Sequence, residues 1–283
     1  MTLFDRKILS KKRITRNKIL LFQKLIRQYY RRNARNLPWR KTNNPYHILV
    51  SEIMLQQTQV ERVIEKYEPF LSVFPDFSSL AQAPLRTVLS LWQGLGYNRR
   101  ALALQRIAQE VMNNFNGSLP SSESILVRLP GIGKATAAAI AAFAFNKPSV
   151  FIETNIRRVF IHFFFHDEEN VSDADIFPLV EKTLDTSDPR QWYYALMDYG
   201  AMLKKQFQNP NRKSAHYQRQ KSFEGSNRQI RGMVLKAIIE TPSVTESALA
   251  RTFNQPPDKI KQVLIQLQKE GFIRKQGKRF TIG

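Results

Sequence analysis

The segment Ser51 to Val60, read SEIMLQQTQV, places one carboxylate, that of Glu52, on an apolar turn of an expected helix. Its neighbours within one turn are aliphatic: Ile48, Leu49 and Leu55. Apolar surroundings raise the pKa of a carboxyl, and a carboxyl shifted in this way can donate a proton near neutral pH. Glu52 is therefore a candidate general acid, and the alternative is that it simply faces solvent, as most helical Glu residues do.

A second segment, LPGIGKATAAAIAAFAF from Leu129 to Phe145, is typical of two helices joined by a tight glycine turn. Gly131 and Gly133 permit backbone angles and close approaches that other residues resist, so their N–H groups can point at an anion. The second helix should begin near Lys134. The segment predicts a phosphate-binding hairpin, although glycine also joins many ordinary helix pairs.

A second carboxylate follows in FIETNIRRVF, where Glu153 stands at an expected helix start. Arg157 and Arg158 lie in the next turn. The chain thus carries two carboxylates at notable positions, with one candidate phosphate clamp between them.

The composition independently favours a polyanionic partner. Lys and Arg number 44 against 23 Asp and Glu, which gives a formal charge of +21, as expected of a protein that neutralises phosphates. A merely soluble basic protein or one bound to an anionic membrane is the alternative. No long apolar run predicts a membrane span, and the first residues lack a secretory signal, so we expect a cytoplasmic, nucleoid-associated protein. Its 283 residues allow one large or two modest domains.

The end of the chain has the pattern of a separate module over residues 226–283. Helical spacing or capping residues mark 228–240, 241–253 and 256–273, and a short hairpin is expected around Gly277. Three helices and a two-stranded wing predict a winged helix-turn-helix. Its presumptive DNA face carries Lys259, Lys261, Gln262, Arg274, Lys275, Lys278 and Arg279. Winged helices also mediate protein contacts, but the charge of the wing favours DNA.

Together these segments resemble the helix-hairpin-helix DNA glycosylase superfamily, and within it the A/G-specific adenine glycosylases. The resemblance covers about the first three-quarters of the chain. It runs through LPWR (Leu37 to Arg40), PYHILVSEIMLQQTQV, LWQGLGYNRRA (Leu91 to Ala101), LPGIGKATA, ETNIRRV and ALMDYGAM (Ala195 to Met202). It implies an all-α fold, with a glycosylase core of two helical subdomains over residues 1–225 before the winged helix-turn-helix domain of residues 226–283.

The resemblance also implies roles for particular residues. Glu52 would protonate the departing purine and Glu153 would stabilise the sugar cation. Double-stranded DNA with a mismatched or damaged base pair would be the partner of a monomeric protein. The implied DNA-binding residues are Gln56, Gln57, Tyr97, Gly131, Gly133, Lys134 and Arg157, and the implied base-pocket residues are Trp39, Arg40 and Tyr194. Trp39 could instead anchor helix packing, and Asp198 could be structural.

Four departures from the family pattern bear on chemistry. The chain has no cysteine, so the family's iron–sulfur cluster cannot be ligated by thiolates, and we expect neither metal nor cofactor. The segment that would hold the cluster, 203–226, is instead basic. Ala135 occupies the position of the Schiff-base lysine of endonuclease III relatives, which predicts a monofunctional enzyme. Glu153 replaces an Asp, and Tyr194 replaces the Glu or Gln that the family presents to adenine.

The leading hypothesis is a monofunctional glycosylase that hydrolyses the N-glycosidic bond of adenine opposite G or 8-oxoguanine in base excision repair. Residues 229–283 do not resemble the family's Nudix-like domain for 8-oxoguanine. The first alternative is a thymine or uracil mismatch glycosylase on the same scaffold, which Tyr194 and Ala135 favour. The second is a non-catalytic DNA-binding winged-helix protein, which the change to Glu153 favours.

Overall fold

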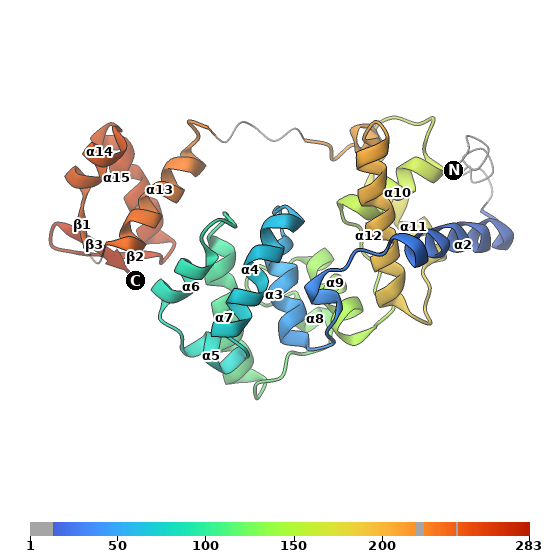
Figure 1. Ribbon diagram of the computed structural model, residues 1–283, viewed down its shortest axis with the longest axis horizontal. Helices are drawn as coiled ribbons and strands as arrows, with labels where there is room; N and C mark the ends of the chain where they lie inside the picture. Colours follow the sequence, from blue (N-terminus) through green and yellow to red (C-terminus); the bar gives the residue numbers. More distant parts are fainter. Residues whose placement is uncertain (1–13, 219–223, 242) are drawn as a thin grey trace. The chain divides into compact units, whose positions relative to one another are not determined.

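The computed structural model describes residues 14–218, 224–241 and 243–283, and the chain divides into two compact units (Figure 1). The first unit contains residues up to 48 together with 121–128 and 132–219. The second contains 49–120, 129–131 and the chain from 220 on. The chain therefore passes from one unit to the other within helix α3 (Pro45–Leu55), the helix that carries Glu52.

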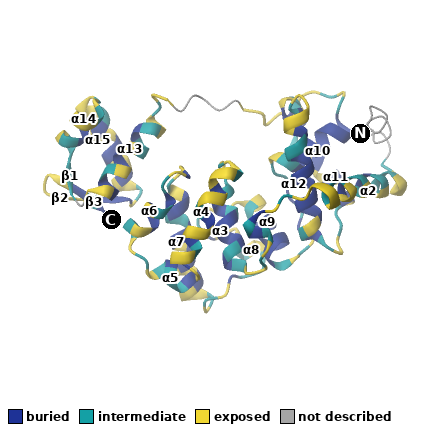
Figure 2. Ribbon diagram, in the orientation of Figure 1, coloured by how far each residue is buried: buried dark blue, intermediate teal, exposed yellow. Residues whose placement is uncertain are grey.

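The first unit is helical around an aromatic core. Its elements are α2 (Arg16–Asn33), η1 (Pro38–Arg40), α8 (Glu123–Leu126), α9 (Lys134–Phe145), α10 (Thr154–Phe164), α11 (Asp173–Thr183), α12 (Pro189–Gln206) and η2 (Pro210–Lys213). Helix α12 packs against α2, α9 and α10, and buried residues fill most of its length (Figure 2). Phe22 of α2 makes edge-on contacts with Phe160 and Trp192 at ring-centroid distances of 5.5 and 5.8 Å. Such contacts add to the large apolar area that aromatic residues bury.

The second unit begins with the rest of α3 and four further helices. These are α4 (Val60–Val73), α5 (Phe77–Gln82), α6 (Leu85–Trp92) and α7 (Arg99–Asn114). Trp92 is fully buried and meets Phe70 edge-on at 5.9 Å. Helix α7 packs against both α5 and α6, so the loop before α7, which contains the GLGY sequence, is held between packed helices.

The predicted winged helix forms in the second unit. It contains α13 (Asn227–Glu240), β1 (Val244–Thr245), α14 (Glu246–Phe253), α15 (Pro257–Lys269), β2 (Ile273–Gln276) and β3 (Arg279–Ile282). The strands are antiparallel in the order β1-β3-β2. Gly277 turns the hairpin with φ of 60°, a value that glycine adopts without strain. The predicted helical architecture is confirmed, and the short strand β1 is an addition to it.

None of the helices that the structure describes combines the length and the apolar composition that a membrane span requires.

Candidate functional site

Glu52 lies on the last turn of α3, as predicted. Its side chain is half-buried, whereas Leu49, Ile53 and Met54 around it on the helix are buried. The carboxylate thus stands at the edge of an apolar helical surface, neither withdrawn into the core nor fully in water. This position suits a proton donor, and its role as the acid stays a prediction.

Arg100 organises the end of α3, and sequence reasoning missed it. A helix end leaves backbone carbonyls without partners in the helix, and the guanidinium of Arg100 supplies donors to them from inside the protein, where only 8% of the residue is exposed. Burial lowers its pKa to about 10, so it stays charged at neutral pH. Its acceptors are the carbonyl oxygens of Ile53 (3.0 Å), Met54 (2.7 Å), Gln56 (2.5 Å), Leu95 (3.1 Å) and Gly96 (2.9 Å) and the hydroxyl of Thr58 (2.8 Å).

Arg100 joins the two loops that carry predicted DNA-binding residues, one after α3 and one before α7. Gln57 and Tyr97 both have positive φ, at 54° and 47°, a conformation that side-chain-bearing residues rarely adopt and that clusters at functional sites. Gln57 is exposed and Tyr97 is 39% exposed. Gln56 donates to the carbonyl of Gly131 at 3.3 Å. The structure therefore brings these residues and the first glycine of the hairpin into one neighbourhood of the second unit.

The two hairpin glycines turn out to differ. Gly131 has φ of 77°, and a Cβ added to it would lie 3.0 Å from the Cβ of Ala103, so this position requires glycine. Gly133 is the N-cap of α9 with φ of −85°, and nothing lies within 4 Å of an added Cβ. The expectation that Gly133 adopts a backbone closed to other residues is wrong, because its conformation is ordinary extended backbone. Lys134 begins α9 as predicted.

Glu153 caps the N-terminus of α10 with its own carboxylate. Oε1 accepts from the backbone N–H groups of Asn155 (2.7 Å) and Ile156 (2.9 Å), and Oε2 accepts from the Asn155 side chain at 3.2 Å. Desolvation raises the pKa of the Glu153 carboxyl, while these backbone donors, Arg158 and Arg157 oppose the shift. The helix N-terminus thus supplies donors that favour the charged form that charge stabilisation at a sugar would need.

A buried network fixes the helix start on which Glu153 sits. Arg158, only 3% exposed, donates to Asn155 Oδ1 (2.6 Å), the carbonyl of Gly200 on α12 (2.7 Å) and Asn209 Oδ1 (3.0 Å). Asn211 donates to the carbonyl of Thr154 at 2.9 Å. The segment just after α12 is therefore bonded through polar side chains to the first turn of α10.

Arg157, predicted to bind DNA, has a partner within the protein. Its Nε and Nη2 donate to the two carboxylate oxygens of Asp173 at 2.6 and 2.7 Å. This two-point ion pair links α10 to the start of α11, and the carboxylate of Asp173 neutralises the charge of Arg157. Its contact with DNA stays a prediction.

The predicted base-pocket residues lie in the first unit, where two of them touch. The Arg40 guanidinium stands 4.5 Å from the centre of the Tyr194 ring, and Tyr194 stacks on Phe143 at 4.8 Å. Arg40 also donates to both oxygens of Asp198 at 2.8 Å. Trp39 is buried with 5% exposure, which suits the packing alternative. Asp198 additionally accepts from the backbone N–H of Arg35 at 2.9 Å, so its structural role is evident.

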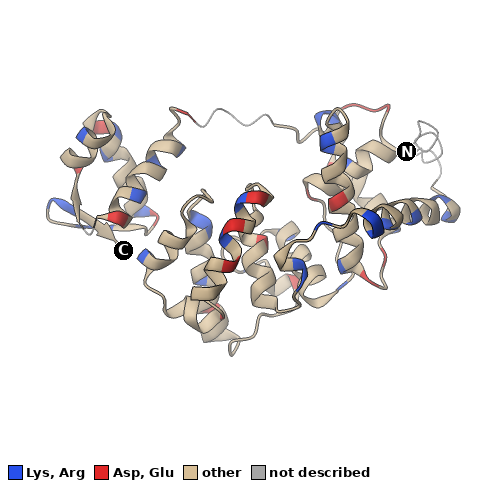
Figure 3. Ribbon diagram, in the orientation of Figure 1, with Lys and Arg blue, Asp and Glu red and all other residues tan. Residues whose placement is uncertain are grey.

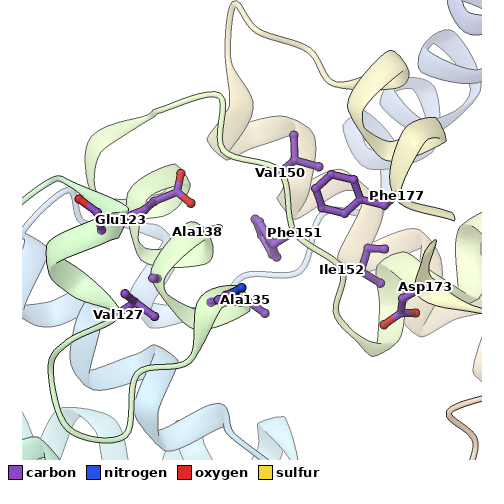
Figure 4. Close-up of a pocket in the computed structure, with 12 residues that line it drawn as sticks. Glu123, Val127, Ala135, Ala138, Val150, Phe151, Ile152, Asp173 and Phe177 are labelled. Carbon is purple, nitrogen blue, oxygen red and sulfur yellow. The ribbon is translucent and has the colours of Figure 1, made fainter. Parts of the chain in front are cut away.

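A cavity of about 500 Å³ opens elsewhere in the first unit, between α8, α9, α11 and the segment before α10 (Figure 4). Apolar side chains such as Val127, Phe151 and Phe177 line it, with Glu123 and Asp173 at its margin. Among the predicted site residues only Lys134 lines it. Figure 4 shows Ala135 among the residues that line this space.

Among the residues that the structure describes, no three His, Cys, Asp or Glu side chains converge as a metal site would require.

Comparison with known proteins agrees with this architecture. Residues 50–176 match the model of the HhH-GPD superfamily base excision DNA repair protein. The adenine DNA glycosylase of Buchnera aphidicola subsp. Baizongia pistaciae is 38% identical over 189 residues, which cover 65% of this chain and 53% of that protein. That of Rattus norvegicus is 31% identical over 243 residues, 82% of this chain and 46% of that protein. The chain spans about half the length of these and other curated relatives that it matches.

Solved structures agree on the fold. A thermostable thymine-DNA glycosylase superposes with a TM-score of 0.58 at 27% identity, over 66% of this chain and 87% of that chain. An endonuclease III in a non-covalent DNA complex superposes with a TM-score of 0.55 at 18% identity, over 65% and 85% of the two chains. The chain therefore has the helix-hairpin-helix glycosylase fold, and its residues 50–176 match the HhH-GPD superfamily of base excision DNA repair proteins.

Proposed function

We propose that this protein is a monofunctional DNA glycosylase that removes adenine from mismatched DNA, with G or 8-oxoguanine as the opposite base. The observation that supports it most directly is that both carboxylates, Glu52 and Glu153, fall within the residues that match the family and stand at helix ends. Relatives named adenine DNA glycosylase share this part of the chain.

The reaction begins when the target nucleotide leaves the base stack. Extrusion costs a few kcal/mol and is cheapest at a mismatch. Tyr97, together with Gln56, fills the vacated stack; Tyr97 is exposed and its φ of 47° is a strained backbone conformation. The hairpin at Gly131 grips the DNA backbone.

Glu52 then protonates N7 of adenine, which allows the base to leave as a neutral molecule. The bond between C1′ and the base breaks, and positive charge develops on the sugar. The carboxylate of Glu153 stabilises that charge, and the N–H donors of Asn155 and Ile156 favour its charged form. Glu52, now deprotonated, accepts a proton from the water that attacks C1′.

The oligomeric state and the location of the protein in the cell are also part of the proposal. The protein acts as a monomer on double-stranded DNA in the cytoplasm, associated with the nucleoid. Its formal charge of +21 supports this association, and neither a metal nor a cofactor is required.

A thymine or uracil mismatch glycosylase is the second candidate. It is favoured by the structural similarity to a thymine-DNA glycosylase at 27% identity, and by Tyr194, whose ring stacks on Phe143 at the position of the family's adenine-facing Glu or Gln. Against it stands Glu52, because a pyrimidine has no N7 to protonate.

One experiment separates the candidates. Duplexes carrying A, T or U opposite G or 8-oxoguanine are incubated with excess protein, and abasic sites are then cleaved with alkali. The proposal expects cleavage at A. Cleavage only at T or U would replace it with the second candidate, and no cleavage of any duplex that the protein binds would indicate a non-catalytic DNA-binding protein.

A further inference from the structure

Within the second unit, the carboxylate of Glu270 joins the winged helix to helix α7. Glu270, at the end of α15, accepts a two-point ion pair from Arg99 at 2.8 and 2.7 Å and another from Arg231 at 2.9 and 2.8 Å. Arg99 is the first residue of α7, and Arg231 belongs to α13. One side chain therefore joins three helices, two of the winged helix and one outside it.

A second contact closes the other end of α13. Arg86 of α6 donates to the carbonyl of Ile238 at 3.1 Å and to that of Ile239. Carbonyls at the end of a helix need outside donors, and a cation there also complements the helix dipole. Helices α6 and α13 are in direct contact along this region.

The docked surface lies beside the loop of Tyr97. Arg99 is two residues beyond Tyr97 in the chain, and Arg228 at the start of α13 donates to the Tyr97 hydroxyl at 3.3 Å. The element predicted to read DNA and the first helix of the winged helix are thus in contact within one compact unit.

The docking leaves a different face of the module exposed. All six residues from Arg274 to Arg279 are exposed, and four of them are Lys or Arg with no acid among them (Figure 3). In the first half of α15, Lys261 and Gln262 are exposed as well. The carboxylate of Glu270, by contrast, does not lie on this exposed face, because it is paired with Arg99 and Arg231 in the docking contact.

We propose that the winged helix is a second DNA-binding element, docked beside the Tyr97 loop so that wing and loop contact one duplex. This inference rests on the proposed function in one respect: DNA is the partner proposed there for the Tyr97 loop. The wing and the first half of α15 bind phosphates of the double-stranded DNA that flanks the target base, as the wing and recognition helix of such modules do. The face used for docking and the face used for DNA are separate, so both can be occupied together.

Charge and surface chemistry favour DNA over a protein partner. Interface cores of proteins are rich in aromatic residues and poor in lysine, whereas the six residues of the wing tip are Arg, Lys, Gln, Gly, Lys and Arg. A cluster of cations without acids on an exposed hairpin suits a phosphate backbone.

The test measures how binding depends on salt. Fluorescence anisotropy gives the affinity of the full chain for undamaged duplexes of about one helical turn (~10 base pairs) and about three turns. Lys278→Gln should lower the slope of log K against log[salt] on the longer duplex by roughly 0.9, and Arg274→Gln with Lys278→Gln by roughly twice that. On the short duplex the salt slope should change little, because the glycosylase core alone would cover its whole length and leave no flanking DNA for the wing.

Lys236→Gln is the matched control, because it removes one exposed lysine from the same module, on α13. Its slope should equal that of the parent. An unchanged slope in the double variant overturns the proposal and assigns the wing to a protein, and an equal loss on both duplexes overturns the separate flanking contact. Because these duplexes contain no lesion, this outcome is independent of whether the protein excises adenine.

Discussion

Gly200 of α12 lies directly against the backbone of Asn155 in the first turn of α10. A Cβ added to Gly200 would stand 2.4 Å from the Asn155 carbonyl oxygen and 2.7 Å from its Cβ, distances that atoms in a folded protein do not tolerate. Because Gly200 has no side chain, the DYGA segment of α12 can lie directly against the ETN segment at the start of α10. This contact sets where the Glu153 carboxylate stands.

Gly200→Ala is therefore expected to push the first turn of α10 away from α12. Overpacking of this kind costs about 1–3 kcal/mol, and it should reduce the rate of base excision because the Glu153 cap moves with the turn. Thermal unfolding and single-turnover excision with excess enzyme measure the two effects. Gly232→Ala in α13 is the control, since nothing lies within 4 Å of its added Cβ and alanine favours a helix over glycine by about 1 kcal/mol. Equal stability of the two variants would contradict the assigned contact.

Glu52→Gln should abolish most base excision while leaving duplex binding within a few-fold. The amide keeps the volume of the side chain but cannot donate the proton, and general acid catalysis contributes about 10²–10⁴-fold. Single-turnover excision and anisotropy on the same duplex provide the comparison. Glu61→Gln, on the first turn of α4 and exposed, serves as the control and should excise at the parental rate. Near-parental excision by Glu52→Gln would remove this residue from the mechanism.

Borohydride should trap no covalent complex between the protein and abasic DNA. The side chain at position 135 is a methyl group at the second residue of α9, so it offers no amine to form a Schiff base. Ala135→Lys is the positive control and should allow trapping, which denaturing electrophoresis detects. A trapped adduct with the parent that disappears in Lys134→Gln would show that Lys134 has taken over the chemistry.

The positions of the candidate residues on helices and loops could be predicted from the sequence, because short-range signals decide them. Glu153 at a helix start, Lys134 as the first residue of a helix and the wing around Gly277 all follow from spacing and residue type. The need for glycine at Gly131 was also predictable, since its backbone angle is a local property. The ordinary backbone conformation of Gly133 was not predictable, because the sequence alone does not distinguish a glycine with positive φ from one with negative φ.

Long-range polar contacts could not be predicted in this way. Nothing in the local sequence marks Arg100 or Arg158 as buried, yet both are buried and bind carbonyls contributed by distant segments. Arg157 has the same residue type but pairs with Asp173. Which arginine binds backbone, which binds a carboxylate and which remains for DNA depends on tertiary packing, which periodicity and composition do not encode.

The docking carboxylate Glu270 should make the stability of the second unit depend on acid pH. Hydrogen bonds and charge from Arg99 and Arg231 lower its pKa to about 2, below that of an unfolded Glu at about 4.3. A lowered pKa stabilises the folded state above the unfolded pKa, and this stabilisation is lost as pH falls toward the folded pKa. Glu270→Gln should thus be less stable than the parent at pH 6, and the difference should shrink between about pH 5 and pH 2.

Denaturant unfolding at several pH values, followed by circular dichroism, measures this difference. Glu240→Gln is the matched control, since its carboxylate is 63% exposed and pairs only with Lys236 at 3.6 Å, and exposed pairs contribute little. It should track the parent at every pH. A Glu270→Gln variant that also tracks the parent would mean that this carboxylate does not hold the winged helix in place.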